Sequence, residues 1–574
     1  MDKIPEENQM IINRIKVLRQ KFKDFQIDGY IIPKNDEFFS EYAENDRLKN
    51  ISNFTGSAGL AIILKKNNYL FVDGRYVIQA DKESGKNFKV IEIHKNLPSS
   101  VLKSCKLGFD PHLFTSKKLK NYFSNNITLV SINENLVDQI YKNKLKKTKP
   151  FFSLQKKIVG ESHKSKIKKI INFLKLNKAD YLFVSASENV AWLLNIRGYD
   201  NPTSPIPNSH LIIGKDKTLL LITEKNNTKK IIAEKKISKN QVISFLEFRE
   251  IIKNLKGTNF IIDNQSCSVF YEKVIKSRFK IIDKNDPIYK FKSIKNSFEI
   301  KHMVEAHKKD GLALTKFIYW IKNINNKNIT EVDAQNKLEK FRKMNNDYLY
   351  PSFNTIAGAG SNGAIVHYRA TKLNGKIINK NDIFLCDSGG QYKYGTTDVT
   401  RTLCFSEPKQ YIKDTFTKVL KGHIAVVLTN LNKDNTGKKI DLRARKFLKK
   451  DGLDYAHGTG HGVGFFLNVH EGPQSISKYN TIKIEKGMIL SNEPGFYKKN
   501  NFGIRIENLL YVNQKKKNLY FKNLTLVPIE KDLINYALLN KIEKDYLFKY
   551  HLNIYVEFSK YLNKKEKKWL ASFI

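Results

Sequence analysis

The stretch HGTGHGVGFFLNVHEGP, residues 457–473, is the part of the chain around which we expect the fold to be built. It holds three of the twelve histidines, His457, His461 and His470, among five glycines. Histidine is the commonest neutral metal ligand and carries protons near pH 7. Glycines allow positive φ or a close approach of the backbone to a ligand. A lone histidine is more often structural, but three within fourteen residues favour a functional site, and the apolar residues 465–469 predict a buried segment beside it.

Two aspartates upstream of this stretch frame a predicted hairpin. The apolar run Ile383–Cys386 predicts a strand that delivers Asp387 to its end. Gly389-Gly390 lets the chain turn, and Asp398 follows eleven residues after Asp387. Two carboxylates at strand ends joined by a hairpin can face one point. An acidic residue at the end of an apolar strand also demands compensation, because burying a charge is costly.

Two glutamates downstream repeat the pattern. The apolar residues 488–490 lead to Glu493, and the alternation in residues 504–507 places Arg505 and Glu507 on one face of a strand. Taken singly, each of these carboxylates is more often a surface residue or a turn former.

Four carboxylates with His461 would form a ligand set rich in oxygen with one nitrogen. Such a set suits Mn²⁺, with Co²⁺, Fe²⁺ or Zn²⁺ as alternatives, and is unlike a thiolate or three-histidine zinc site. Four carboxylates exceed the needs of one divalent ion, whereas two ions sharing them can activate a water for hydrolysis. Spacing alone leaves a dinuclear hydrolase and unrelated carboxylates as equal alternatives.

Length and pattern predict an α/β chain of three domains. A chain of 574 residues is too long for one core, and its 41% hydrophobic and 11% aromatic content indicates a globular protein. Helical spacing over residues 10–25 is followed by strand-like runs, and a helix over 162–176 leads into a similar run, which suggests an internal repeat. We expect domains at 1–150, 151–287 and 288–574, with a Lys-rich linker over residues 142–149. The last domain opens with predicted helices over 297–323 and 330–343.

The start of the chain and its cysteines bear on location. The first 30 residues contain no apolar segment typical of a secretion signal, and no run of 18 apolar residues follows. The four cysteines form no CxxC pair and no disulfide framework, and packing is the favoured role of Cys386 and Cys404. These features predict a cytoplasmic protein without a membrane span.

The net charge of +45 could indicate a polyanion partner. The positive residues are mostly Lys, however, and they are spread through all thirds of the chain in short runs. No basic stripe with interleaved aromatics occurs. A solvated lysine surface is therefore favoured, and no nucleic-acid partner is predicted.

The order of short motifs carries a family resemblance. GAIVHY (363–368), DSGGQYKYGTTDVTRT (387–402), HGTGHGVG (457–464), HEGP (470–473), EPG (493–495) and GIRIEN (503–508) resemble the metallopeptidases of the pita-bread fold. That family includes methionine aminopeptidase, prolidase, creatinase and aminopeptidase P. FTGSAG (54–59), DGRY (73–76), WLLNIRG (192–198) and LTLVPI (524–529) resemble its three-domain aminopeptidase P form. The resemblance implies two creatinase-like α/β domains before a pita-bread catalytic domain.

The resemblance also implies roles for particular residues. The family's five metal ligands fall on Asp387, Asp398, His461, Glu493 and Glu507, with Asp398 and Glu507 bridging two ions. His367, His457 and His470 match substrate-binding histidines. Of these, His367 and His470 would act in catalysis together with Glu493 as the proton shuttle. Arg369 departs from the HYAP that close relatives often carry, which puts in doubt the family's leaving-group side of the pocket.

The implied reaction is hydrolysis of the bond before proline by a hydroxide that bridges two divalent metal ions, most suitably Mn²⁺. The implied substrates are peptides with proline at the second position, and the implied assembly is a homodimer. A prolidase that cleaves only Xaa-Pro dipeptides is the nearest alternative. A non-catalytic pita-bread binding protein is a third reading, which the complete ligand set disfavours.

Overall fold

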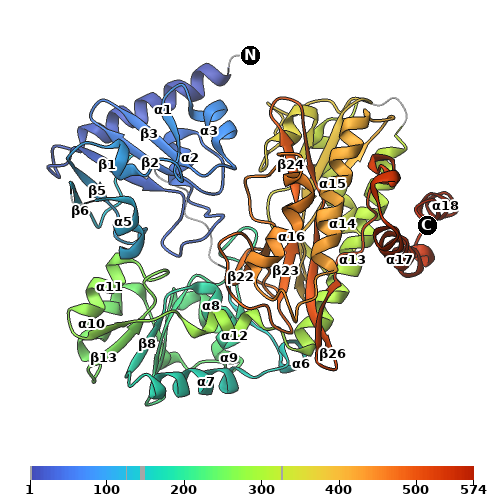
Figure 1. Cartoon of the computed structure of the whole chain (residues 1–574). Coiled ribbons are helices and arrows are strands. Elements are labelled where there is room, and N and C mark those ends of the chain that lie inside the picture. Colours follow the sequence, from blue (N-terminus) through green and yellow to red (C-terminus); the bar gives the residue numbers. More distant parts are fainter. Residues whose placement is uncertain (1–2, 125, 142–148, 325–327) are drawn as a thin grey trace. The chain divides into compact units, whose positions relative to one another are not determined.

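The computed structural model describes residues 3–124, 126–141, 149–324 and 328–574. It divides into two compact units, Met1–Lys156 with Glu161–Ile288, and Lys157–Gly160 with Tyr289–Ile574 (Figure 1). Most of the linker predicted over residues 142–149 lies outside the described residues. None of the helices in the described ranges is long and apolar enough to cross a membrane.

The first unit begins with helix α1 (Lys3–Gln20) and a six-stranded sheet of order β4-β3-β2-β1-β5-β6. The central strand β1 pairs antiparallel with β2 and parallel with β5. Helices α2 (Arg47–Ser52), α3 (Val77–Ser84) and α5 (Ser116–Tyr122) connect its strands. The strands are β1 (Gly29–Pro33), β2 (Leu60–Leu64), β3 (Asn68–Val72), β4 (Lys89–Glu92), β5 (Cys105–Phe109) and β6 (Ile127–Ser131).

A second six-stranded sheet repeats this arrangement in the order β12-β11-β10-β8-β13-β14. Its central strand β8 pairs antiparallel with β10 and parallel with β13, as β1 does with β2 and β5. The predicted internal repeat is therefore confirmed. The strands are β8 (Tyr181–Val184), β10 (His210–Gly214), β11 (Leu219–Ile222), β12 (Val242–Ile243), β13 (Asn259–Ile262) and β14 (Lys280–Asp283).

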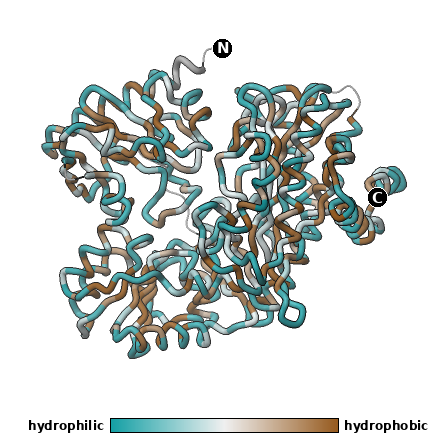
Figure 2. Tube along the Cα trace, viewed as in Figure 1, coloured by the Kyte–Doolittle hydropathy of each residue, from teal (hydrophilic) through white to brown (hydrophobic). Residues whose placement is uncertain are grey.

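The helix that leads into each repeat is amphipathic, as predicted. α7 (His163–Leu176) is capped by Ser162, whose side chain accepts from the Ser165 N–H, and it buries Ile170 and Leu174. Helices α8 (Ser187–Leu194), α10 (Phe248–Asn254) and α11 (Val269–Lys276) complete the repeat. Figure 2 shows hydrophobic and hydrophilic residues alternating in short segments along the chain in both units.

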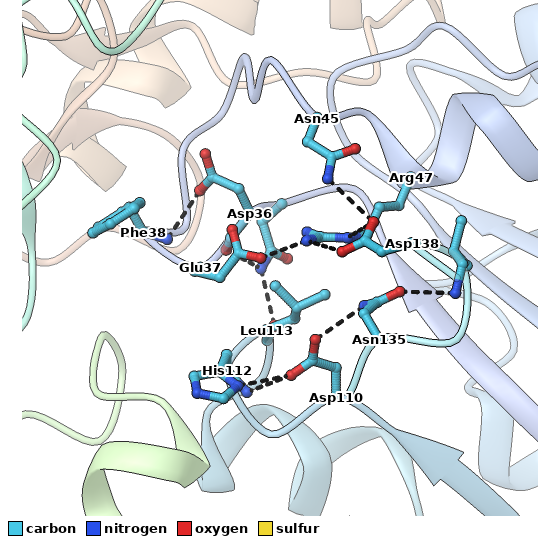
Figure 3. A network of polar contacts seen from close by, with 12 residues as sticks. Asp36, Glu37, Phe38, Asn45, Arg47, Asp110, His112, Leu113, Asn135 and Asp138 are labelled. Carbon is cyan, nitrogen blue, oxygen red and sulfur yellow. Dashed lines mark hydrogen bonds and ion pairs between the residues drawn. The ribbon is translucent and has the colours of Figure 1, made fainter. Parts of the chain in front are cut away.

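A polar network surrounds the loop that follows β1 (Figure 3). Buried Arg47 donates from Nε and Nη2 to Asp138, at 2.9 and 2.7 Å, and also from Nη2 to Glu37. Asp36 accepts from the Phe38 N–H at 3.0 Å, and burial raises the pKa of its carboxyl to about 6. These contacts fix the long loop between β1 and α2.

The second unit opens with α12 (Pro287–Ser293), α13 (Ser297–Lys322) and α14 (Glu331–Lys343). Thr330 caps α14 and forms the reciprocal pair with Asp333 that the sequence predicts. Helices α13 and α14 pack on the sheet β16-β17-β20 through an apolar cluster that includes Leu314, Leu338 and Phe384. Beside it, β15 (Tyr348–Pro351), β18 (Gly390–Tyr392) and β19 (Gly395–Thr396) form a three-stranded sheet.

A second helix pair, α15 (Gln410–Val427) and α16 (Gly437–Lys449), packs on the sheet β22-β21-β23-β26-β27. Helices α17 (Lys541–Phe558) and α18 (Lys564–Ala571) follow (Figure 1). Strands β17 (Ile383–Ser388) and β21 (Gly460–Gly462) of this unit contain predicted site residues, and β20 (Val399–Cys404), β23 (Ile489–Asn492) and β25 (Phe502–Arg505) lie next to them in the sequence. The others are β16 (Ile356–Ala359), β22 (Glu471–Ile476), β24 (Gly495–Lys498), β26 (Asn508–Lys515) and β27 (Asn518–Asn523).

Candidate metal centre

Strands β17 and β20 place the two predicted aspartates. They pair antiparallel, with Asp387 opposite Thr400, and Asp398 directly precedes β20. Both aspartates are buried, with 7% and 4% of their surface exposed. The hairpin predicted between them is present, and it carries the short strands β18 and β19.

Strands β21 and β23 place His461 beside Glu493. The two strands pair where Gly462 lies opposite Leu490, and the Glu493 N–H donates to the Thr459 carbonyl at 2.8 Å. Ser491 connects these two residues. Its Oγ accepts a hydrogen bond from the His461 backbone N–H at 2.9 Å and donates one to Glu493 Oε1 at 3.1 Å.

The predicted ligands converge on one point. His461 Nε2 lies 3.4 Å from Asp398 Oδ2 and 3.5 Å from Glu493 Oε1. Ligand atoms of Asp398, His461 and Glu507 all lie within 4.8 Å of one another. Glu507 reaches the cluster because its N–H donates to the Thr400 carbonyl at 3.1 Å.

The electrostatics of the cluster call for cations. Burial, followed by repulsion from Asp387 and Glu493, raises the pKa of Asp398 well above its usual value. Burial and repulsion from Asp398 do the same to the pKa of Glu507. Asp387 Oδ1 and Glu507 Oε1 are buried without a hydrogen-bond partner among the described residues. Since buried carboxylate oxygens need a donor or a cation, the donor set fits divalent metal ions.

Arg505 and Thr400 orient the carboxylates of Asp387 and Glu507. Arg505 Nη2 donates to Asp387 Oδ2 at 2.6 Å, and its Nε donates to Thr400 Oγ1 at 3.1 Å. Thr400 Oγ1 in turn donates to Glu507 Oε2 at 2.7 Å. Sequence reasoning placed Arg505 and Glu507 on one face but missed Thr400, although its position two residues after Asp398 in an alternating strand gives a signal.

The three predicted histidines are all half-buried and have different neighbours. The His470 and His461 rings meet edge to face with centroids 4.2 Å apart. His457 Nε2 forms a 2.8 Å hydrogen bond with Tyr497 Oη, which also accepts from Arg505 Nη1 at 2.6 Å. His367 is half-buried and follows Val366, whose carbonyl accepts from Arg505 Nη2 at 3.3 Å.

Tyr497 links His457 to the carboxylates but was not predicted from the sequence. Burial raises the pKa of its phenol to about 12, so the hydroxyl keeps its proton near neutral pH. Its place in the sequence, four residues after Glu493 on a short strand, carries no chemical signature.

The glycines of residues 457–464 serve packing rather than unusual backbone angles. Of the two properties that the sequence left open for these glycines, positive φ does not apply, because none of Gly458, Gly460, Gly462 or Gly464 is among the positive-φ glycines. A Cβ on Gly460 would lie 1.9 Å from the Ser491 carbonyl oxygen. The close approach that glycine permits here is therefore between neighbouring strands.

Another buried group flanks the site at Glu471, the residue after His470. Its carboxylate binds Lys292 at 3.1 Å and also Lys295, and all three side chains are at most 2% exposed. Both cysteines near the aspartates are inert, since burial raises the pKa of the Cys386 and Cys404 thiols to about 12.

Comparisons with known proteins agree along nearly the whole chain. Residues 301–514 match metallopeptidase family M24, residues 517–572 its C-terminal region, and residues 14–140 and 142–299 the creatinase/prolidase N-terminal domain. The matches to these models confirm the predicted fold class.

Named relatives cover the chain end to end. Xaa-Pro aminopeptidase 1 of Dictyostelium discoideum is 36% identical, covering 98% of this chain and 96% of its own. Aminopeptidase P2 of Arabidopsis thaliana is 34% identical, covering 98% and 88%. The structure of X-prolyl aminopeptidase from Caenorhabditis elegans, described as a cytosolic enzyme with a di-nuclear active site, superimposes with a TM-score of 0.89 at 28% identity over 98% and 99% of the two chains. Identity above 30% over nearly the full length shows that this chain belongs to metallopeptidase family M24.

Proposed function

We propose that the chain is an Xaa-Pro aminopeptidase, which hydrolyses the bond before a proline in second position and releases the N-terminal residue. The observation that carries this proposal is the convergence of Asp398, His461 and Glu507 within 4.8 Å, in a chain that aligns end to end with relatives of that name. Asp387 and Glu493 complete a donor set of four carboxylates and one imidazole.

Within this function, Asp387, Asp398, His461, Glu493 and Glu507 would hold two divalent cations, and we propose Mn²⁺ because the donors are mostly carboxylate oxygens. Bound there, the cations would supply Lewis acidity and lower the pKa of a water. Asp398 and Glu507, the two carboxyls whose pKa values are raised well above the usual range, would be shared between them.

Glu493 is the proposed proton carrier. It is half-buried, the Ser491 hydroxyl donates to its Oε1 at 3.1 Å, and it would take the proton of the attacking water. It would deliver that proton to the departing proline nitrogen. The Xaa-Pro bond lacks an N–H, so recognition rests on groups around the carbonyl rather than on the amide.

His470, His367 and His457 are proposed to bind the substrate. His470 lies against His461 and is placed to donate a hydrogen bond to the carbonyl oxygen as negative charge develops on it, with His367 as its catalytic partner. His457, held by the neutral Tyr497 hydroxyl, would contact the substrate farther from the metal ions.

Further proposals concern organisation. We place domain boundaries near residues 150 and 287 and propose a homodimer, as in the family resemblance, which light scattering on the purified protein tests. A cytoplasmic location is supported by the cytosolic relative from Caenorhabditis elegans. The proposed binding partners are peptides with proline in second position. No nucleic-acid partner is proposed despite the net charge of +45.

The nearest alternative is a dipeptide-specific prolidase. The prolidase structure from Pyrococcus horikoshii aligns with a TM-score of 0.52 and covers only 64% of this chain, against 98% for the aminopeptidase from Caenorhabditis elegans. That difference favours the aminopeptidase.

The test is release of the N-terminal residue from an Xaa-Pro-Pro peptide by metal-stripped protein, with and without Mn²⁺, beside Asp398→Asn. Release that requires Mn²⁺ and fails in the variant supports the proposal. Faster cleavage of Gly-Pro than of the tripeptide would favour the prolidase. Folded protein that releases nothing with any divalent ion would favour a non-catalytic binding protein.

A further inference from the structure

One buried ion pair contacts the hairpin that joins Asp387 to Asp398 without touching either aspartate. Asp310 lies in α13 and Arg342 in α14, and they are 2% and 1% exposed. Arg342 Nε donates to Asp310 Oδ1 at 2.8 Å, and Nη2 donates to Oδ2 at 3.3 Å. The ion pair therefore connects the two helices in addition to their apolar contacts.

The pair holds the hairpin where it leaves Asp387 and where it returns to Asp398. Arg342 Nη2 donates to the hydroxyl of Ser388 at 3.0 Å, and Ser388 directly follows Asp387. Asp310 Oδ2 accepts from the hydroxyl of Thr397 at 2.9 Å, and Thr397 directly precedes Asp398.

The middle of the hairpin is held by the same carboxylate. Tyr392 Oη donates to Asp310 Oδ1 at 2.8 Å from a fully buried position. Thr397 Oγ1 also accepts from the Gly390 N–H at 2.9 Å, which closes the base of the hairpin. Asp310 therefore accepts hydrogen bonds from Arg342, Tyr392 and Thr397, and its two oxygens are fully used.

This arrangement exceeds what core packing requires. A buried ion pair is commonly no more stable than apolar side chains of the same volume, so its presence calls for a geometric role. When both are ionised, as binding of a metal ion requires, Asp387 and Asp398 would repel each other in a buried cluster, and fixed ends of the hairpin would oppose that repulsion. Hydrogen bonds to an ion pair are strong enough to fix them.

We propose that Asp310 and Arg342 are positioning residues of the metal centre, which set the spacing of Asp387 and Asp398 by anchoring Ser388 and Thr397. This inference rests on the proposed metal site. It predicts that the ion pair acts through metal affinity, as partners of metal ligands do in other proteins, where their loss weakens binding by about 10–100-fold.

The test removes the two anchoring hydroxyls and leaves the ion pair intact. The variants are Thr397→Val, Ser388→Ala and the double variant, each of which deletes a hydroxyl with little change of shape. The control is Thr315→Val, because buried Thr315 lies on α13 and, among the described residues, its hydroxyl donates only to the Gly311 carbonyl of its own helix, at 2.7 Å. Mn²⁺ affinity is measured by competition with a chelating dye, and folding by circular dichroism.

Wild-type protein and Thr315→Val are expected to bind Mn²⁺ equally. Each anchoring variant is expected to bind about tenfold more weakly, and the double variant more weakly still, all with wild-type circular dichroism. Wild-type affinity in the double variant would overturn the inference. Wild-type protein that binds no Mn²⁺ would instead refute the proposed metal site, so the two failures are distinguishable.

Discussion

Glu471 is buried beside two lysines, so one negative charge is in contact with two positive charges. The effect of removing that negative charge on stability can therefore be predicted. Its carboxylate is 1% exposed and binds Lys292 and Lys295, whose side chains are 2% and 0% exposed. Glu471→Gln leaves both ammonium groups buried without a countercharge. Breaking a buried pair in this way costs about 3–5 kcal/mol of unfolding free energy.

Removing one lysine is expected to cost less. Lys295→Met leaves a neutral pair of Lys292 and Glu471 at 3.1 Å, and the apolar side chain fills much of the vacated volume. The expected loss is about 1.5–3 kcal/mol, that of one charge-assisted hydrogen bond. The glutamine variant should therefore be less stable than the methionine variant by about 2 kcal/mol.

The assay is urea unfolding followed by tryptophan fluorescence. The chain has three tryptophans, Trp192 in the first unit and Trp320 and Trp569 in the second. With both variants built on a Trp192→Phe background, the signal reports only the unit that contains Glu471. Equal losses in the two variants, or a loss below about 1 kcal/mol for Glu471→Gln, would refute the reasoning.

The pH dependence gives an independent check. Burial lowers the pKa of Lys295 from its usual value, while Glu471 acts to raise it. A lysine whose folded pKa is lowered adds stability as the pH rises from that pKa towards the unfolded value. Without Glu471 the lowering is greater, so the deficit of Glu471→Gln should shrink as the pH approaches about 10.5.

Three further predictions follow from the site. The raised pKa values of Asp398 and Glu507 mean that the metal-free fold loses stability as the pH rises above the ordinary carboxyl range. Mn²⁺ should therefore raise the melting temperature more at about pH 8 than at about pH 5.5. An equal increase at the two pH values would contradict this. Thr400→Val removes the hydroxyl between Arg505 and Glu507 and should weaken Mn²⁺ binding about tenfold, measured by dye competition. Gly460→Ala should lower the melting temperature strongly, because the added Cβ would lie 1.9 Å from the Ser491 carbonyl oxygen. The control variant Gly472→Ala should change the melting temperature little, because its Cβ would have open space around it.

The sequence allows prediction of those site residues whose chemistry is expressed locally. Asp387 and Glu493 each follow an apolar run, and the structure confirms both runs as strands, β17 and β23. Thr330 and Asp333 have the three-residue spacing of a helix cap, and they form one. In each case the signal and its cause lie within a few residues, so the pattern determines the structure.

The glycines show the limit of prediction from the local sequence. An absent side chain at Gly460 or Gly462 is visible in the sequence, but it has two possible causes, positive φ and close approach. Which one applies depends on what lies opposite. The partners are Ser491 and Glu471, which sheet pairing brings next to β21 from other parts of the chain. Local spacing carries no information about that pairing.

Asp310 and Arg342, which anchor the hairpin, could not be predicted from the sequence for the same reason, because their partners lie still farther away along the chain. Asp310 and Arg342 sit on helices where charged residues normally face solvent, and they are 32 residues apart. Arg342 lies 46 residues from Ser388, and Asp310 lies 87 residues from Thr397. Both ends of the hairpin nevertheless depend on this one ion pair, because the strand pairing that brings Asp387 and Asp398 together also brings their neighbours onto α13 and α14. Local motifs therefore suggest the candidate ligands of such a centre, whereas the residues proposed to hold them against their mutual repulsion become visible only once the sheet and its covering helices are assembled.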